Sequence, residues 1–407
     1  MLCLDEATVC KPVVEKELEF YECLPGELHP FTPEYYGVIK VKVLPDGEYI
    51  SLVGTAPNNY TPKLSSNFKR LRFRRSGSLE QDVGAAGMFE EDAGCNSHAT
   101  ATGMNPWVFR CHRDHLATLA ATIEAKNTPQ NFLVLENLTW KFRLPCILDL
   151  KMGTRQYDDN DSLAKRQRKM VKVVTTTSGK LGVRVGGMQV YQVTSGRFLC
   201  RNKFYGRTLS AGGFSAAVRH FLHDGTRLRV EVLPPLIRRL EALVDVLENQ
   251  TSLRLYTTSL LLLYEGEPVQ QPTDKLREKR ESMERSSSLE DRAEDIDSDG
   301  SSSGLERSSS SGSLSAILVG KEVVTPEDRR GTAATSARKM NRRRSSSCCT
   351  EEISAEEPLT DVRIIDFAHS THKGMSDSVV YSGPDNGFLF GLENMIAILK
   401  SIHRDYR

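Results

Sequence analysis

The sequence contains no apolar run long enough to cross a bilayer, for which about 20 consecutive apolar residues are needed. The residues after Met1 do not follow the basic-then-apolar pattern of a secretory signal. Nine cysteines are scattered along the 407 residues without the spacing of a metal site or a disulfide framework. We therefore expect reduced thiols in a protein without a membrane span, located in the cytoplasm and the nucleus.

A large net charge is also missing, because 54 Lys and Arg residues face 53 Asp and Glu residues and leave only +1. The overall charge therefore favours neither nucleic acid nor a membrane as a partner. Only a local cluster of charges could support such an interaction, and no nucleic-acid partner is expected.

The most informative stretch is residues 145–153, an apolar run that predicts a buried strand. Asp149 and Lys151 lie two residues apart, so both side chains leave the same face of that strand. Opposite charges on a buried strand are costly unless they are used. Two interpretations remain open: a structural ion pair at a strand end, or a pair with a chemical role.

The same stretch matches every fixed position of Pro-x-x-x-Asp-x-Lys-x-Gly, and it resembles the signature of the inositol polyphosphate kinase family. The hexakisphosphate kinase branch is the most similar, and the resemblance covers roughly residues 9–53, 105–263 and 362–404. It implies an α+β fold of two lobes with antiparallel sheets, related to protein kinases and ATP-grasp enzymes. ATP is expected between the lobes, together with Mg²⁺.

The resemblance also implies a set of nucleotide-binding residues. A strand lysine that holds ATP phosphates and a helix glutamate that positions it fit Lys11 and Glu17. From the residues alone, an ordinary edge-strand lysine is the favoured interpretation of Lys11. The resemblance to the family favours the role in binding ATP phosphates instead. Residues 132–135 and the polar link after them resemble a kinase hinge, whose backbone faces adenine. The implied set is Lys11, Glu17, Glu136, Leu138, Asp149, Lys203 and Asp366, with Asp366 and Ser259 at the metal.

A cationic helix is predicted just after the signature. Lys165, Arg168, Lys169 and Lys172 follow a spacing of i, i+3, i+4 and i+7, which places them on one helical face. A solvated face is the alternative, but almost no acid is interleaved, which favours a polyanionic partner. With the resemblance, the expected substrate-binding set is Pro145, Lys151, Gly153, Lys165, Arg168, Lys169, Lys172, Lys180, Arg184 and His369.

Composition divides the chain into five parts. Residues 1–60 are expected to form an N-lobe that starts too late to include a strand and a glycine-containing turn found in relatives. Residues 61–104 and 266–358 are expected to be disordered insertions, because their polar composition cannot bury a core. Residues 105–265 hold the rest of the N-lobe, the hinge, the signature, the inositol phosphate-binding segment and the C-lobe, which residues 359–407 complete. Serines follow arginines at 74–78, 285–288 and 342–347, so regulatory kinases or binding proteins are expected there.

The resemblance implies an ATP-dependent inositol hexakisphosphate kinase that transfers a phosphoryl group to a ring phosphate and makes an inositol pyrophosphate. Asp149 and Lys151 are then the catalytic pair. A phosphate acceptor is already ionised, so positioning and charge neutralisation matter more than proton removal. Two alternatives remain: a kinase for hydroxyls of inositol tris- or tetrakisphosphate, and a catalytically impaired inositol phosphate-binding scaffold.

Overall fold

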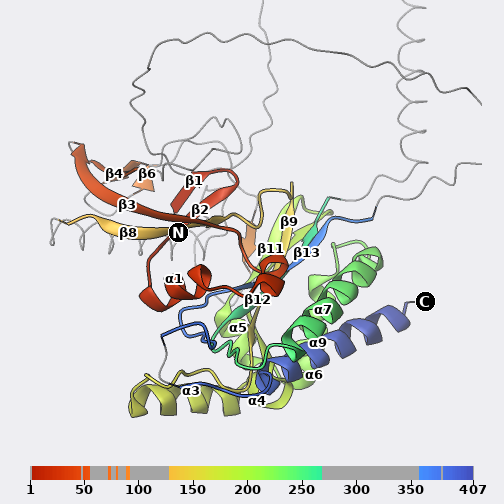
Figure 1. The fold of residues 1–407 in the computed structure, drawn as a ribbon. Coiled ribbons are helices and arrows are strands. Elements are labelled where there is room, and N and C mark those ends of the chain that lie inside the picture. Colours follow the sequence, from red (N-terminus) through yellow and green to blue (C-terminus); the bar gives the residue numbers. More distant parts are fainter. Residues whose placement is uncertain are drawn as a thin grey trace, which may run out of the picture.

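The computed structural model describes residues 2–46, 49–55, 72–74, 79–80, 89–91, 128–267, 357–376 and 379–406. Figure 1 shows two sheets, with α1 (Glu15–Glu22) below the first and the longer helices around the second. All strand pairs in the described residues are antiparallel except β7–β11. The predicted α+β fold with antiparallel sheets is confirmed.

The first sheet holds seven strands. Its order is β1 (Leu2–Asp5), β2 (Thr8–Pro12), β8 (Gln130–Glu136), β3 (Tyr35–Asp46), β4 (Tyr49–Thr55), β5 (Arg72–Arg74) and β6 (Leu79–Glu80). The expectation that no strand precedes Lys11 is wrong, since β1 pairs with β2 through a tight turn. That turn needs no glycine, because the Asp5 carboxylate accepts a hydrogen bond from the Ala7 N–H at 2.9 Å.

The second sheet holds six strands and carries the signature near its centre. Its order is β13 (Thr360–Ile365), β12 (Ser259–Glu265), β9 (Pro145–Met152), β10 (Val183–Gln192), β11 (Arg197–Arg201) and β7 (Phe89–Glu91). Strand β10 is continuous over Val183–Gln192, and its register against β9 shifts between Val185 and Gly187. The strands β5, β6 and β7 lie inside the stretch predicted to be a disordered insertion, and the rest of that stretch lies outside the described residues.

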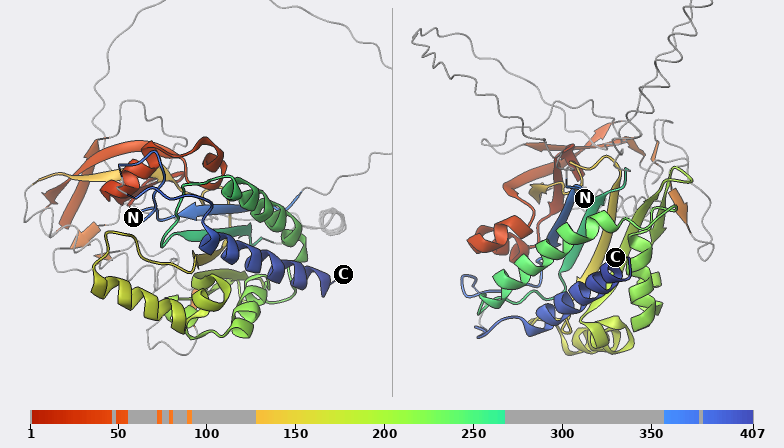
Figure 2. Two further views of the ribbon diagram at one scale, coloured as in Figure 1. Left: turned by 60° about the horizontal axis from the view of Figure 1, so that its bottom comes forward. Right: turned by 90° about the vertical axis from the view of Figure 1, so that its right-hand side faces the viewer.

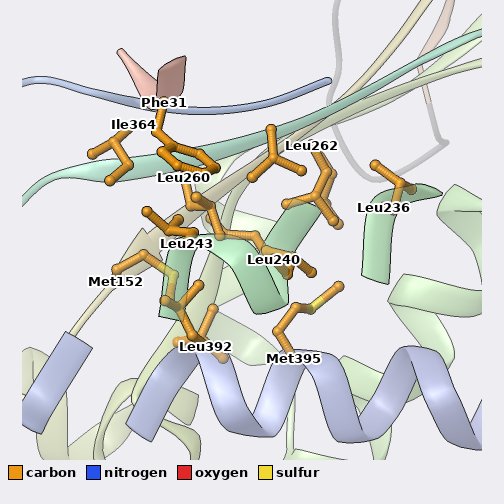
Figure 3. Close-up of a cluster of buried hydrophobic side chains, with 14 of the residues drawn as sticks. Phe31, Met152, Leu236, Leu240, Leu243, Leu260, Leu262, Ile364, Leu392 and Met395 are labelled. Carbon is orange, nitrogen blue, oxygen red and sulfur yellow. The ribbon is translucent and has the colours of Figure 1, made fainter. Parts of the chain in front are cut away.

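Three helices cover one side of the second sheet: α6 (Ala211–Phe221), α7 (Leu233–Glu248) and α9 (Asn386–Arg404) (Figure 2). The apolar stripe of α7 is buried, with Leu236, Leu240 and Leu243 fully inaccessible to solvent. Figure 3 shows these leucines between Leu392 and Met395 of α9 and the sheet residues Leu260 and Leu262. This core fixes the second sheet as a rigid platform.

Three further helices follow strands β9 and β11 in the chain. They are α3 (Leu163–Thr175), α4 (Thr177–Leu181) and α5 (Lys203–Thr208). A Cβ on Gly206 would lie 1.9 Å from the Val185 carbonyl oxygen, so α5 can pack directly on β10 only with glycine there. No helix in the described part of the chain is long and apolar enough to cross a membrane.

The two sheets are joined by side chains as well as by the chain itself. Arg363 of β13 donates to the Thr32 carbonyl at 2.7 Å and to the Glu136 carboxylate at 3.2 Å. Phe20 of α1 stacks on Phe367, which follows β13, with ring centroids 4.3 Å apart and planes 9° from parallel. Residues from both ends of the sequence therefore define the boundary between the sheets.

Candidate active site

Two lysines and one aspartate meet where the sheets approach each other. Lys11 Nζ lies 2.9 Å from Glu17 Oε1 and 2.9 Å from Asp366 Oδ1. Lys151 Nζ lies 2.9 Å from the other oxygen, Asp366 Oδ2. We call Lys11, Glu17, Lys151 and Asp366 the ion-pair cluster. It joins four elements that are separated by up to 355 positions in sequence.

Strand register explains why these groups meet. Ser259 is the cross-strand partner of Lys151 on one side and of Ile365 on the other, so Asp366 follows directly beside Lys151. Ser259 is fully buried, and its hydroxyl is hydrogen-bonded to Lys151 Nζ. The hydroxyl predicted to lie beside the metal thus contacts the signature lysine, which favours a role in orienting that side chain.

Asp366 has the backbone conformation of a functional position. Its φ of 68° lies in the left-handed region, which costs a non-glycine residue about 1–3 kcal/mol. The turn directs its carboxylate to the two lysines, while the next N–H, of Phe367, donates to Glu17 Oε1 at 3.2 Å. Burial alone would raise the pKa of Asp366, but Lys151 and Lys11 outweigh burial and hold that pKa well below its ordinary value. The carboxylate is therefore ionised throughout the neutral range.

Asp149 lies on the same face of β9 as Lys151, and its environment is different. Its Oδ1 is buried without a hydrogen-bond partner among the described residues. A Cβ on Gly186 would lie 3.0 Å from the Asp149 carboxylate, so the bulge of β10 leaves just enough room for this side chain. A buried oxygen without a partner costs about 1–3 kcal/mol. This geometry points to a ligand or a cation that completes the site.

The predicted metal fits the donor atoms that are present. Asp366 and Asp149 offer carboxylate oxygens and Ser259 a hydroxyl, and Mg²⁺ prefers such hard oxygen ligands. Glu17 adds a second buried oxygen without a partner, Oε2, beside Lys11. The residues therefore suit a divalent cation held mainly by carboxylates.

The predicted hinge lies at the end of β8. The Glu136 N–H donates to the Glu34 carbonyl at 2.8 Å, so an adenine would use the Glu136 carbonyl and not this N–H. The Asn137 N–H donates to the Ala7 carbonyl at 2.7 Å, which fastens the link to the turn between β1 and β2. Leu138 follows in the half-buried segment after it. The position between the sheets agrees with a hinge, and the contact with adenine remains a prediction.

A second charged group lies near the other side of Lys151, and its charge is not balanced. Arg184 is the cross-strand partner of Lys151 and is buried. Its guanidinium donates to Gln156 Oε1 and Ser178 Oγ, which are neutral acceptors. Within the described part of the chain, no carboxylate lies within ion-pair distance of Arg184. Burial and the neighbouring Arg207 lower the pKa of Arg184 to about 10, against the opposing effect of Asp149.

Other cations surround this arginine. Burial lowers the pKa of Lys172, and so does the nearby positive charge of Arg184, Arg207, Lys169 and Lys203. We call Lys172, Arg184, Lys203 and Arg207 the cation cluster. Lys203, expected at the nucleotide phosphates, is thus placed beside the helix expected to bind substrate. Arg207, Gln156 and Ser178 were not predicted; Arg207 lies in the same short segment as Lys203, and nothing in the sequence singles out the other two.

The remaining predicted substrate residues divide into three groups. Lys165 and Lys169 both pair with the buried Asp161, at 2.5 and 2.7 Å, and His369 contacts Asp158 in the same loop. Arg168 and Lys180 are exposed, and Lys180 lies in the short helix α4. Gly153 turns the chain with φ 88°, whereas Pro145 lies at the far end of β9, about 20 Å from Lys151 at 3.3 Å per residue. The four helix cations therefore do not act as one uniform face.

A strand lysine, a helix glutamate and a strand-end aspartate that meet between two sheets define the kinase-like class of folds. Comparison with known proteins gives the family. A model described as "Inositol polyphosphate kinase" matches residues 132–400. The chain belongs to the inositol polyphosphate kinase family, as the signature predicted.

The relatives found lie on the branch that the sequence indicated. Human inositol hexakisphosphate kinase 1 is 35% identical over 99% of this chain and 90% of its own length. Mouse inositol hexakisphosphate kinase 3 is 34% identical, over 98% and 90% of the two chains. A solved inositol phosphate multikinase from S. cerevisiae, in complex with ADP and Mn²⁺, is 19% identical with a TM-score of 0.48, over 97% of this chain and 99% of that one.

Proposed function

We propose that the protein is an ATP-dependent inositol hexakisphosphate kinase, which transfers the γ-phosphoryl group to a ring phosphate and makes an inositol pyrophosphate. The observation that carries this proposal is the position of Lys151. It belongs to the ion-pair cluster through its contact with Asp366 and is the cross-strand neighbour of Arg184 in the cation cluster. A phosphoryl group moving from a nucleotide to a polyanion would pass such a lysine.

The residues fit the two anionic reactants separately. Lys11, held by Glu17, would bind the nucleotide phosphates, and the backbone of Glu136 and Leu138 would bind adenine. Asp366 and Asp149 would hold Mg²⁺, which supplies charge neutralisation between the phosphates. Arg184, Lys172, Lys203 and Arg207 would bind the substrate's phosphates, with Lys165, Lys169 and His369 at the edge.

Lys151 would then stabilise the charge of the group in transit. A ring phosphate is largely ionised at neutral pH, so a strong base is not required and Asp149 would orient the acceptor or hold the metal. Holding both reactants close against their mutual repulsion is the main task, and fixed cations perform it without reorganisation.

The proposal also covers where the protein acts and how it is controlled. We propose the cytoplasm and the nucleus as its locations, and the serines after arginines at 285–288 and 342–347 as sites for regulatory kinases; both stretches lie outside the described residues.

The test is turnover of the purified chain with Mg²⁺ and ATP on inositol hexakisphosphate and, separately, on inositol trisphosphate, with products resolved by charge. We expect a pyrophosphate-containing product from hexakisphosphate and little turnover of trisphosphate. Preferential turnover of trisphosphate would instead assign a hydroxyl kinase. Binding of hexakisphosphate without any transfer, checked by calorimetry with each ligand, would assign a scaffold.

A further inference from the structure

The helix α3 is amphipathic, but its apolar face is exposed to solvent and its charged face points into the protein. Its apolar side chains Leu163, Met170, Val171 and Val174 are 76, 51, 62 and 76% exposed. Their spacing of i, i+7, i+8 and i+11 places them on one face. Such a face normally points into a core, and here it points away from the protein.

The opposite face of α3 explains this orientation. Lys165 and Lys169 turn inward to the buried Asp161, and Val173 between the inner cations is itself buried. Lys172 lies against Arg184 in the cation cluster. The charged face is therefore used inside the molecule, and the apolar stripe is left at the outer edge, where Figure 1 and Figure 2 show α3.

We propose that α3 is an interfacial helix, which docks the protein on the surface of an anionic lipid bilayer through its outward apolar face. This inference does not depend on the proposed kinase activity, because it concerns the face of α3 that points away from the site.

Charge selects this occupant. The segment from Ser162 to Arg184 contains seven Lys and Arg residues and no Asp or Glu, although Lys165, Lys169, Lys172 and Arg184 are used by the inner contacts described above. Arg166 and Arg168 lie on opposite flanks of the apolar stripe, and Arg168 is exposed. Arg166 donates to the carbonyl oxygens of Asp159 and Asp161 and also interacts electrostatically with the Asp159 carboxylate, whereas Lys180 is exposed like Arg168. Apolar side chains flanked by arginines are typical of helices that lie in the headgroup region of anionic membranes.

The same flanks oppose a second copy of this chain. Two α3 helices packed face to face would bring their arginines together, and like charges repel. A further exposed apolar pair, Val379 and Val380 at 42 and 74%, precedes Tyr381, whose hydroxyl bonds to Asp159 in the loop before α3. This adds apolar surface next to the start of the helix.

The experiment is sedimentation of the full chain with vesicles of phosphatidylcholine alone or mixed with phosphatidylserine. We expect binding to the mixed vesicles that weakens with added salt, and weak binding to phosphatidylcholine alone. The double variant Leu163→Glu/Val174→Glu should lose about tenfold or more of the affinity for mixed vesicles, because two side chains that would enter the bilayer become charged. Leu359→Glu, at a 43% exposed leucine beside β13, is the matched control and should bind like the wild type.

Measurements of folding distinguish a loss of membrane binding from a loss of the folded structure. Both variants should keep the wild-type melting temperature and, without vesicles, the wild-type turnover, since neither leucine nor valine faces the site. Equal vesicle binding by the double variant and the wild type would overturn the proposal. So would failure of the wild type to bind mixed vesicles near physiological salt, or a dimer in solution that the double variant dissociates, which would assign the face to a second copy.

Discussion

Lys151 belongs to the ion-pair cluster and is the cross-strand neighbour of Arg184 in the cation cluster, yet the charged side chains of the two clusters have different kinds of partner. In the first, Asp366 and Glu17 balance Lys11 and Lys151 at distances of 2.9 Å. In the second, Arg184 is held by an amide and a hydroxyl, and its nearest charged neighbours include another arginine. A balanced cluster can be ordered before any ligand arrives. Arg184, which has no carboxylate partner among the described residues, would be stabilised when a polyanion binds.

The difference assigns separate work to the two regions. Under the proposed function, the ion-pair cluster would fix the geometry of phosphoryl transfer, so changes there should act on the rate. The cation cluster would attract the substrate's phosphates, so changes there should act on substrate affinity and its dependence on salt.

The largest effect is expected from Asp366→Asn. This change removes the negative charge that pairs with both lysines and the carboxylate that we propose for Mg²⁺. We expect a loss of about 10³-fold or more in turnover, because a metal contributes several kcal/mol to such a transition state. Turnover measured across Mg²⁺ concentrations tests this. Unchanged activity and Mg²⁺ dependence would place the metal elsewhere, with Asp149 the next candidate.

Lys151→Ala should lower turnover by about 10²–10³-fold with little loss of fold, because it removes one charge contact in the transition state. Lys11 still balances Asp366 in this variant, so the melting temperature should stay close to that of the wild type. Lys400→Ala serves as the matched lysine control, because Lys400 of α9 forms an exposed ion pair with Glu241 of α7. An active Lys151→Ala protein would remove Lys151 from the mechanism.

Lys172→Gln tests the cation cluster. We expect the KM for the inositol phosphate to rise about 10-fold or more, since bonds to charged groups contribute about 1.5–3 kcal/mol each. The KM for ATP should change little, and substrate affinity should depend less on salt. Steady-state kinetics with each substrate varied in turn, beside Lys40→Gln on β3, measures both. A rise in the KM for ATP alone would mean that α3 faces the nucleotide.

Asp161→Asn should lower the free energy of unfolding by about 0.5–1 kcal/mol at neutral pH, a value reduced because Lys165 is partly exposed. Burial would raise the pKa of Asp161, but its bonds to Lys165 and Lys169 outweigh burial and lower it to about 2. The contribution of a carboxylate with a lowered pKa is complete above about pH 4 and disappears as the pH falls through the folded pKa. Denaturant unfolding of both proteins at several pH values should therefore converge on acidification. A gap that remains undiminished down to about pH 2 would assign the effect to packing.

The smallest effect is expected from replacing residues 268–356 with a short glycine-serine linker. The Glu265 N–H donates to the Leu359 carbonyl at 3.0 Å, so the two ends of this segment are already adjacent. Loop closure depends weakly on length, and neither cluster uses these residues. Turnover and melting temperature should remain close to those of the intact chain. A marked fall in melting temperature would show that the segment contributes to the fold.

The fold and the candidate site could be predicted where the local sequence pattern and the order of the family motifs agree. The apolar run of residues 145–153 predicted β9, and the two-residue spacing of Asp149 and Lys151 predicted their common face. The strand before Lys11 was missed because its turn is closed by the Asp5 side chain and not by glycine.

The cation cluster was harder to predict because it depends on tertiary placement. Helical spacing puts Lys165, Lys169 and Lys172 on one face, but only the loop before α3 brings Asp161 to two of them. Gln156 and Ser178 hold Arg184 from separate segments, and no periodicity links an amide and a hydroxyl 22 positions apart. Contacts of this kind are set by the packed structure alone.

Arg363 gives the boundary between the sheets a mechanical consequence. It lies three residues before Asp366 on β13, and it grips both the carbonyl of Thr32 and the carboxylate of Glu136. Any widening of the gap between the sheets must stretch these bonds or drag the strand that carries Asp366. Under the proposed function, departure of the spent nucleotide would require this gap to widen, so the two bonds of Arg363 would couple that opening to movement of Asp366 away from its lysines.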